Sequence, residues 1–267
     1  MMRDNEKKRI RIAGIGFEIE RRLLFKEIKL FEKEDCDNIY FSVESSNNLS
    51  VLHEMELFCI KKSDCYIFKY MGDIMIVENQ WKKSKIPSTC YRTESILLFI
   101  MWSFYAHAVQ RHMIQLHSSL VDFQGHGILF LGPSGIGKTT QAELWNKYRD
   151  ALIINGDIVF VQETEENFLG WGTPWHGSSP YCENTNVPVH AMIVLKQDTE
   201  NSIRELIGFE KVTAVSNSVF YPQWVENGME LCLETLDHLL SRIPVYELRC
   251  RPDEDAVALT EKTIFSA

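Results

Sequence analysis

A glycine-rich segment at residues 132–139 has the residue types and spacing of a phosphate-binding loop. It reads GPSGIGKT and matches the Walker A pattern at every fixed position. Glycines permit backbone conformations that turn successive N–H groups toward phosphate oxygens, and the N-terminus of a following helix adds partial positive charge. We expect Lys138 to neutralise the β- and γ-phosphates of a nucleoside triphosphate and the Thr139 hydroxyl to ligate Mg²⁺. The expected nucleotide contacts are Gly132, Ser134, Gly135, Ile136, Gly137, Lys138, Thr139 and Thr140.

The segments on either side of this loop predict the elements that hold it in place. Alternating residues over 114–123, a turn at 125–127 and the apolar run 128–131 predict a β-hairpin whose second strand leads into the loop. A helix is expected over 139–148, followed by one buried strand over 151–161.

The rest of the chain predicts a β-rich region followed by a mixed α/β region. Up to about Cys90, short β-branched or aromatic runs alternate with turn residues, which favours strands. The hydrophobic period changes near Thr93, so we expect an N-terminal region at 1–92 and a second domain at 93–267. Within that domain the sequence predicts a helix over 95–113, a loop-rich stretch over 167–188, a strand over 189–196, helices near 211–220 and 225–242, a strand over 245–250 and a helix opened by Pro252.

Residues 116–161 together resemble the HPr kinase/phosphorylase family. The shared pattern is a histidine at the start of a hairpin (His117), a glycine turn, a loop containing SGIGK, and then a strand ending in two acidic residues. The resemblance thins toward Lys196 and does not extend to the N-terminal ninety residues. It implies ATP- and Mg²⁺-dependent phosphorylation of a serine, which in that family lies on the phosphocarrier protein HPr. It also implies an α/β fold with a mixed sheet, like the P-loop core of phosphoenolpyruvate carboxykinases, preceded here by the β-rich region.

Two further phrases, GWGTPWHG and VYELRCRPDEDAV, resemble the shorter HPr-kinase-like proteins encoded beside peptide-modification enzymes. Some of those proteins phosphorylate a precursor peptide on serine. The resemblance therefore implies a protein or peptide acceptor, including a ribosomal precursor peptide. Thr173, Trp175 and His176 in the first phrase are candidate substrate contacts, because loops rich in Gly and Pro on a rigid scaffold often shape binding sites.

The acidic pair of the family appears in this chain as Gly156-Asp157. In the resembled enzymes the pair divides metal binding and proton handling, so only Asp157 remains to hold Mg²⁺. The expected catalytic residues are Asp157, His117 and Lys138, with either His117 or Asp157 taking the acceptor's proton. Two alternatives stay open: an ATP-binding regulator with impaired catalysis, and a kinase of a small hydroxyl compound.

Composition limits the classes of partner. A net charge of −9, from 28 basic and 37 acidic residues, argues against nucleic acid. The seven cysteines are an odd number without a CxxC pair, which favours reduced thiols and a cytoplasmic location. The longest apolar stretch, 96–105, is about half of the ~20 residues that a membrane span needs. The sequence leaves open the choice between ATP and GTP, the oligomeric state and the role of the N-terminal region.

Overall fold

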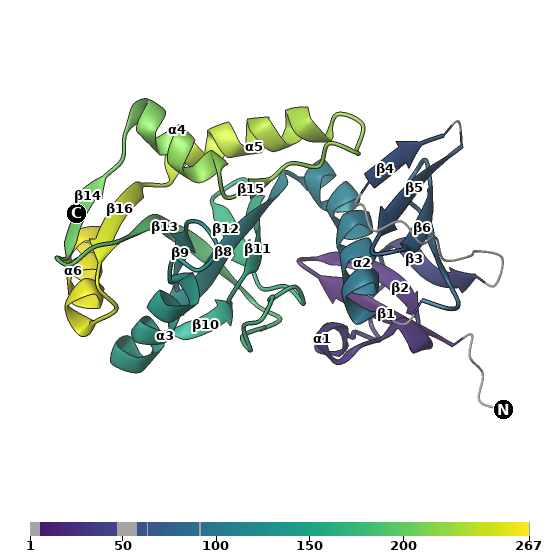
Figure 1. Cartoon of the computed structure of the whole chain (residues 1–267), viewed down its shortest axis with the longest axis horizontal. Helices are drawn as coiled ribbons and strands as arrows, with labels where there is room; N and C mark the ends of the chain where they lie inside the picture. Colours follow the sequence, from purple (N-terminus) through teal and green to yellow (C-terminus); the bar gives the residue numbers. More distant parts are fainter. Residues whose placement is uncertain (1–5, 47–57, 63, 91, 267) are drawn as a thin grey trace. The chain divides into compact units, whose positions relative to one another are not determined.

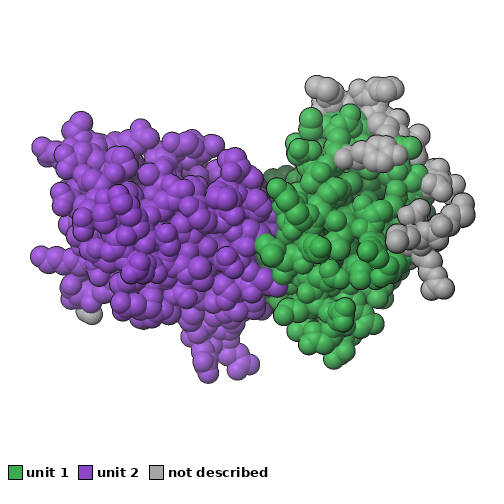
Figure 2. All heavy atoms as spheres, turned by 90° about the horizontal axis from the view of Figure 1, so that it is seen from below, with its two compact units in different colours: residues 1–110, 222–226 green, residues 111–221, 227–267 purple. Residues whose placement is uncertain are grey.

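A computed structural model describes most of the chain, namely residues 6–46, 58–62, 64–90 and 92–266. The chain divides into two compact units, which Figure 2 colours separately: residues 1–110 with 222–226, and residues 111–221 with 227–267. Each unit contains one mixed sheet with helices, so the mixed α/β class and the β-rich N-terminal region are confirmed. The division falls after Gln110, later than the expected boundary at residue 92.

The first unit is built on a seven-stranded sheet in the order β1-β2-β3-β7-β6-β5-β4. The β2–β3 and β3–β7 pairs are parallel and the other pairs are antiparallel. The strands are β1 (Lys7–Ile12), β2 (Ile15–Glu20), β3 (Ile39–Ser46), β4 (Phe58–Lys61), β5 (Cys65–Tyr70), β6 (Asp73–Glu78) and β7 (Lys83–Pro87). Two short helices lie between β2 and β3, η1 (Arg21–Leu23) and α1 (Lys26–Lys29).

Helix α2 (Thr93–Ala108) packs on this first sheet, which explains why the compact unit extends to Gln110. The Trp102 ring lies 4.9 Å from that of Phe68, centroid to centroid, and the hydroxyls of Ser103 and Ser84 are hydrogen-bonded at 2.8 Å. The predicted helix over 95–113 ended too late. After Ala108 the chain forms the single turn η2 (Val109–Arg111), and His112 adopts φ 51°, a left-handed conformation that stops a helix. No helix in the described ranges has both the length and the apolar character to cross a membrane.

The second unit is organised by two long strands, β8 and β13 (Figure 1). β8 pairs antiparallel with β9, β10, β11 and β15. β13 pairs in parallel with β9 and β16 and antiparallel with β12. The strands are β8 (Met113–Phe123), β9 (His126–Leu131), β10 (Leu152–Asn155), β11 (Ile158–Glu163), β12 (Phe168–Trp171), β13 (Asn186–Gln197), β14 (Ser202–Glu205), β15 (Val219–Phe220) and β16 (Val245–Cys250).

Four sequence predictions for the second unit differ from the structure. The single strand over 151–161 is broken into β10 and β11, and the stretch expected as a loop contains β12. The helix near 211–220 is α4 (Gly208–Ser216), and the residues after it enter β15. The hairpin turn is Gln124-Gly125, with φ 55° and 82°, so His126 and Gly127 already belong to β9.

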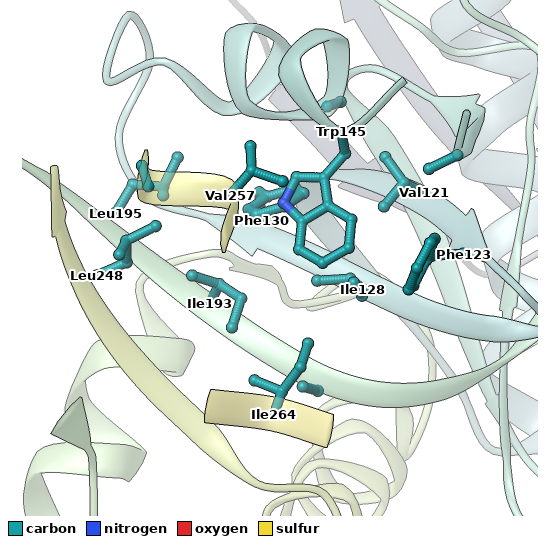
Figure 3. Packing of buried hydrophobic residues seen from close by; sticks show 14 of the residues in the cluster. Val121, Phe123, Ile128, Phe130, Trp145, Ile193, Leu195, Leu248, Val257 and Ile264 are labelled. Atoms are coloured by element: carbon teal, nitrogen blue, oxygen red, sulfur yellow. The ribbon is translucent and has the colours of Figure 1, made fainter. Parts of the chain in front are cut away.

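Helices α3 (Lys138–Arg149) and α6 (Glu254–Phe265) pack together beside the strands of the second unit. Asp253 caps α6 by accepting a hydrogen bond from the Ala256 N–H. Trp145 of α3 is fully buried among Phe130, Ile193 and other apolar residues (Figure 3). This core fixes α3 against β9, and therefore fixes the loop that joins them. The remaining helix is α5 (Gly228–Arg242), which packs against β8.

Candidate functional site

The glycine-rich loop runs from the end of β9 at Leu131 to the first residue of α3, Lys138. Gly132, Gly135 and Gly137 have φ values of 140°, 77° and 114°, in the region that side chains with a Cβ rarely adopt. A Cβ added at Gly135 or Gly137 would meet open space, so the backbone conformation is what requires glycine at both positions. The loop therefore has the backbone shape that the Walker A pattern predicted.

Lys138 lies folded against its own loop. Its Nζ donates to the carbonyl oxygens of Gly132 at 3.1 Å and Pro133 at 3.2 Å, and the residue is 6% exposed. Burial lowers the pKa of this ammonium group, and the negative charge of Asp157 acts in the opposite direction. A largely buried ammonium group that is hydrogen-bonded to two carbonyl oxygens attracts an incoming anion strongly.

The carboxylate of Asp157 is placed by a break in the strand that follows α3. Asn155, fully buried, accepts hydrogen bonds on Oδ1 from the N–H groups of Asp157 at 2.9 Å and Ile158 at 3.1 Å. Its Nδ2 donates to the Thr173 carbonyl at 2.9 Å. This Asx turn divides the expected single strand into β10 and β11 and fixes the backbone of Asp157 at the break.

His117 of β8 lies beside Asp157, and the two side chains are within hydrogen-bonding distance. Nε2 of His117 is 3.0 Å from Oδ1 of Asp157, and both side chains are about one-quarter to one-third exposed, at 26% and 31%. The backbone fixes the pair from both sides, because the Ser118 N–H donates to the Asp157 carbonyl at 2.9 Å and His117 is opposite Ile158 in the ladder.

These groups line one cavity of about 380 Å³, a size in the lower range of ligand pockets. The lining comes from the loop and the start of α3, from the His117–Asp157 pair, and from a second loop at 176–179. The Thr139 hydroxyl donates a hydrogen bond to the Gly156 carbonyl at 3.2 Å. The lining residues are His117, Ser134, Gly135, Gly137, Lys138, Thr139, Thr140, Gly156, Asp157, His176, Ser178 and Ser179.

The structure thus brings most of the residues selected from the sequence into one cavity. Gly132 and Ile136 line a neighbouring cavity of about 740 Å³ instead, beside α4. Thr173 and Trp175 are buried and lie outside the lining; the Thr173 hydroxyl donates to the Ile158 carbonyl at 2.7 Å. His176 lines the cavity while its Nδ1 is hydrogen-bonded to the Ser179 carbonyl.

Sequence reasoning missed the contribution of Ser178 and Ser179, which follow His176 in a turn. A Cβ built on Gly156 would overlap Oγ and Cβ of Ser179. Ser179 therefore fills the space into which a side chain at position 156 would project. The glycine in place of an acidic residue was the available signal, but the sequence did not show which side chain had taken the space.

A divalent cation in this cavity would find few protein ligands. In the ranges that the structure covers, no three His, Cys, Asp or Glu side chains are grouped to hold a metal. Mg²⁺ commonly uses only one or two carboxylates together with substrate phosphates and water. The Thr139 hydroxyl and the Asp157 carboxylate, which line the same cavity, fit that requirement.

The strand–loop–helix and its cavity define a P-loop α/β protein. No protein-family model matches the chain. It is similar to an HPr kinase/phosphorylase of Mycoplasmopsis pulmonis, with 22% identity over 237 residues that cover 88% of this chain and 71% of the relative. It is also similar to an HPr kinase/phosphorylase of Listeria monocytogenes, with 29% identity over 89 residues, 33% of this chain and 28% of the relative.

Among solved structures, the chain is similar to the HPr(Ser) kinase/phosphatase of Coxiella burnetii. The TM-score is 0.34 at 12% identity, and the match covers 57% of this chain and 88% of the other. The strand pairing of this chain shows the mixed sheet directly. Together the sequence relatives support an HPr-kinase-like family, as the resemblance predicted, and they suggest a kinase-like function in general terms.

Proposed function

We propose that this protein is an ATP- and Mg²⁺-dependent kinase that transfers the γ-phosphoryl group to a hydroxyl of a protein or peptide, most simply a serine. The observation that carries the proposal is the His117–Asp157 pair, which lines the same cavity as Lys138 and Thr139. A phosphate cradle alone fits many P-loop proteins. A carboxylate and a histidine that line the same cavity as the cradle would supply what a transfer reaction needs in addition.

The loop would hold the triphosphate through its N–H groups and through Lys138. Phosphate oxygens would replace the Gly132 and Pro133 carbonyls as partners of the Lys138 ammonium. The exchange is favourable because a hydrogen bond between two charged groups is stronger than one to a neutral carbonyl. A third cavity, of about 360 Å³, adjoins the loop at Gly135–Gly137 and reaches Arg251. Its position beside the cradle suits the ribose and base of the nucleotide.

Thr139 and Asp157 would hold Mg²⁺, which supplies neutralisation of the charge on the β- and γ-phosphates. The acceptor hydroxyl attacks the γ-phosphorus, the bond to the bridging oxygen breaks, and the hydroxyl proton passes to the Asp157–His117 pair. The 3.0 Å contact between these two side chains lets them hold that proton jointly. A positioned base of this kind contributes roughly 10²–10⁴-fold to a rate.

One observation favours a second function, an ATP-binding regulator without efficient transfer. Ser179 fills the space beside Gly156, so a second acidic side chain cannot be accommodated there without rearrangement. Positioning and charge neutralisation supply most of the acceleration in phosphoryl transfer, so we rank the kinase first.

The test separates nucleotide binding from transfer. Lys138→Ala should weaken ATP binding in calorimetry at least tenfold, or about 1.4 kcal/mol. Asp157→Asn should retain ATP binding while transfer from labelled ATP to serine-containing peptides falls at least 10²-fold. Unchanged ATP affinity in Lys138→Ala would contradict the cradle. A wild-type protein that binds ATP and labels no acceptor would favour the regulator, and labelling of free serine in place of peptides would favour a small-molecule kinase.

A further inference from the structure

The turn at residues 176–179 contributes His176, Ser178 and Ser179 to the lining of the cavity that also contains the phosphate loop. The Ser179 N–H donates to the His176 carbonyl at 3.0 Å, and His176 Nδ1 is hydrogen-bonded back to the Ser179 carbonyl. These two contacts close a tight turn with Gly177 and Ser178 at its tip. Gly177 has φ 58°, which suits the tip of such a turn.

The tip lies directly against the reactive pair. A Cβ built on Gly177 would be 2.5 Å from Oδ2 of Asp157, so the backbone of the turn approaches that carboxylate as closely as a glycine allows. The next residue, Ser178, lines the same cavity as Lys138 and Thr139. A serine side chain of the protein itself is thus presented to the place where a phosphate acceptor must lie.

The two serines of the turn differ in their availability. Ser179 is 8% exposed, and its Oγ accepts a hydrogen bond from the Tyr181 N–H at 3.3 Å. Ser178 is exposed and has no hydrogen-bond partner among the residues that the structure describes. Its hydroxyl can therefore rotate toward an incoming phosphoryl group without breaking a contact.

The other hydroxyls of the cavity are unsuited to accept phosphate. Ser134, Thr139 and Thr140 belong to the cradle or to the first turn of α3, on the side that would hold the triphosphate. Phosphoryl transfer requires the attacking and leaving oxygens to lie roughly in line, on opposite sides of the phosphorus. Ser178 belongs to a separate segment, next to the Gly177 that lies against the Asp157 carboxylate, so it can supply the attacking oxygen without being part of the phosphate-binding loop.

We propose that Ser178 is a self-phosphorylation site, modified within one chain by the γ-phosphoryl group of ATP bound at 132–139. The proposal rests on the kinase function proposed above. Ser178 Oγ forms the new bond to the γ-phosphorus, the bond to the bridging oxygen breaks and ADP leaves, and the Ser178 hydroxyl proton passes to the Asp157–His117 pair. The turn and the cradle belong to the same compact unit, so no second copy of the chain is needed.

The experiment uses the full chain with ATP and Mg²⁺ and localises phosphate by mass spectrometry. Trypsin releases the turn in a single fragment, residues 150–196, because no Lys or Arg lies between Arg149 and Lys196. We expect a single phosphoryl group on this fragment, placed on Ser178 by fragmentation. The first-order rate constant of labelling should stay unchanged over a hundredfold dilution of the protein.

The variants separate this proposal from the kinase proposal. Ser178→Ala should lose the label, Ser178→Thr should keep it at that position, and Lys138→Ala should abolish it. Ser241→Ala is the matched control, because Ser241 is an exposed serine on α5, outside the cavity, and its label should equal that of wild type. Transfer to an added peptide without label on Ser178 overturns this inference and leaves the kinase intact. Label on another residue, or a rate that rises with protein concentration, also overturns it. Binding of ATP with no transfer to either acceptor overturns both proposals.

Discussion

The Ser179 side chain occupies the space into which a side chain at position 156 would project, so substitutions at these two positions test the packing of the site. A methyl group added at Gly156 would lie inside van der Waals contact with both Oγ and Cβ of Ser179. Gly156 does not have a left-handed φ, so the backbone itself tolerates a side chain. Forcing an extra carbon into a packed site costs roughly 1–3 kcal/mol, so Gly156→Ala should lower the free energy of unfolding of the second unit by about 2 kcal/mol.

Variants of Ser179 show whether its side chain causes the expected loss of stability in Gly156→Ala. Ser179→Gly removes both overlapping atoms, and it forfeits the hydrogen bond from the Tyr181 N–H, at a cost of about 1 kcal/mol. Adding Gly156→Ala to Ser179→Gly should then cost little, which is a coupling energy of about 1–2 kcal/mol in a double-mutant cycle. Ser179→Ala is the matched control, because it removes Oγ but keeps the overlapping Cβ and should therefore give less relief than Ser179→Gly.

Urea unfolding followed by tryptophan fluorescence measures these differences, with the transition of the second unit analysed separately. Stability of Gly156→Ala equal to wild type would refute the reasoning, and so would equal relief by Ser179→Ala and Ser179→Gly. The same geometry governs restoration of an acidic pair. Gly156→Asp alone should displace the 176–179 turn, whereas Gly156→Asp combined with Ser179→Gly should accept the carboxylate and allow its effect on transfer to be measured.

Three other predictions follow from single buried groups. Asn155→Ala should cost about 1–3 kcal/mol of unfolding free energy in urea and reduce peptide labelling more than ATP affinity, because it frees the N–H groups that direct Asp157. Trp145→Ala should cost roughly 3–5 kcal/mol by the same assay, since it opens a cavity under α3. For Glu247, burial raises its pKa, but hydrogen bonds from Lys196 at 2.5 Å and Arg249 at 3.2 Å bring the net pKa below the ordinary 4.5. A carboxyl group whose pKa is lower in the folded state stabilises the fold at pH values above its unfolded-state pKa. This stabilisation is lost as the pH falls through the folded-state pKa. The stability gap between wild type and Glu247→Gln should therefore narrow below about pH 4.5 in urea titrations, whereas exposed Glu200→Gln should show no such gap.

The sequence predicted the backbone shape of the 132–139 loop and its flanking elements well because both depend on local sequence. Glycines with positive φ, an apolar strand before them and a helix after them are all determined by neighbours in the chain, and β9, α3 and the hairpin lie close to where they were expected. The break between β10 and β11 was missed because apolar residues continue on both sides of it. The break is caused by one Asx turn at Asn155. The Asn155 side chain is held in that turn by a hydrogen bond to Thr173, which lies in a later segment. Strand β12 was missed for a similar reason, since its pairing with β11 and β13 outweighs its glycine content.

The sequence did not predict how the part of the cavity outside the phosphate loop is assembled. The cradle comes from one continuous segment, but the rest of the cavity lining combines β8, the break at Gly156-Asp157 and the 176–179 turn. His117 and Asp157 meet only because β8 and β11 pair in one particular register, with His117 opposite Ile158. A shift of one residue in that pairing would turn His117 to the other face of the sheet and leave Asp157 without its partner. In the proposed mechanism the strand register, more than the loop motif, therefore brings together the groups that would make transfer possible in addition to nucleotide binding.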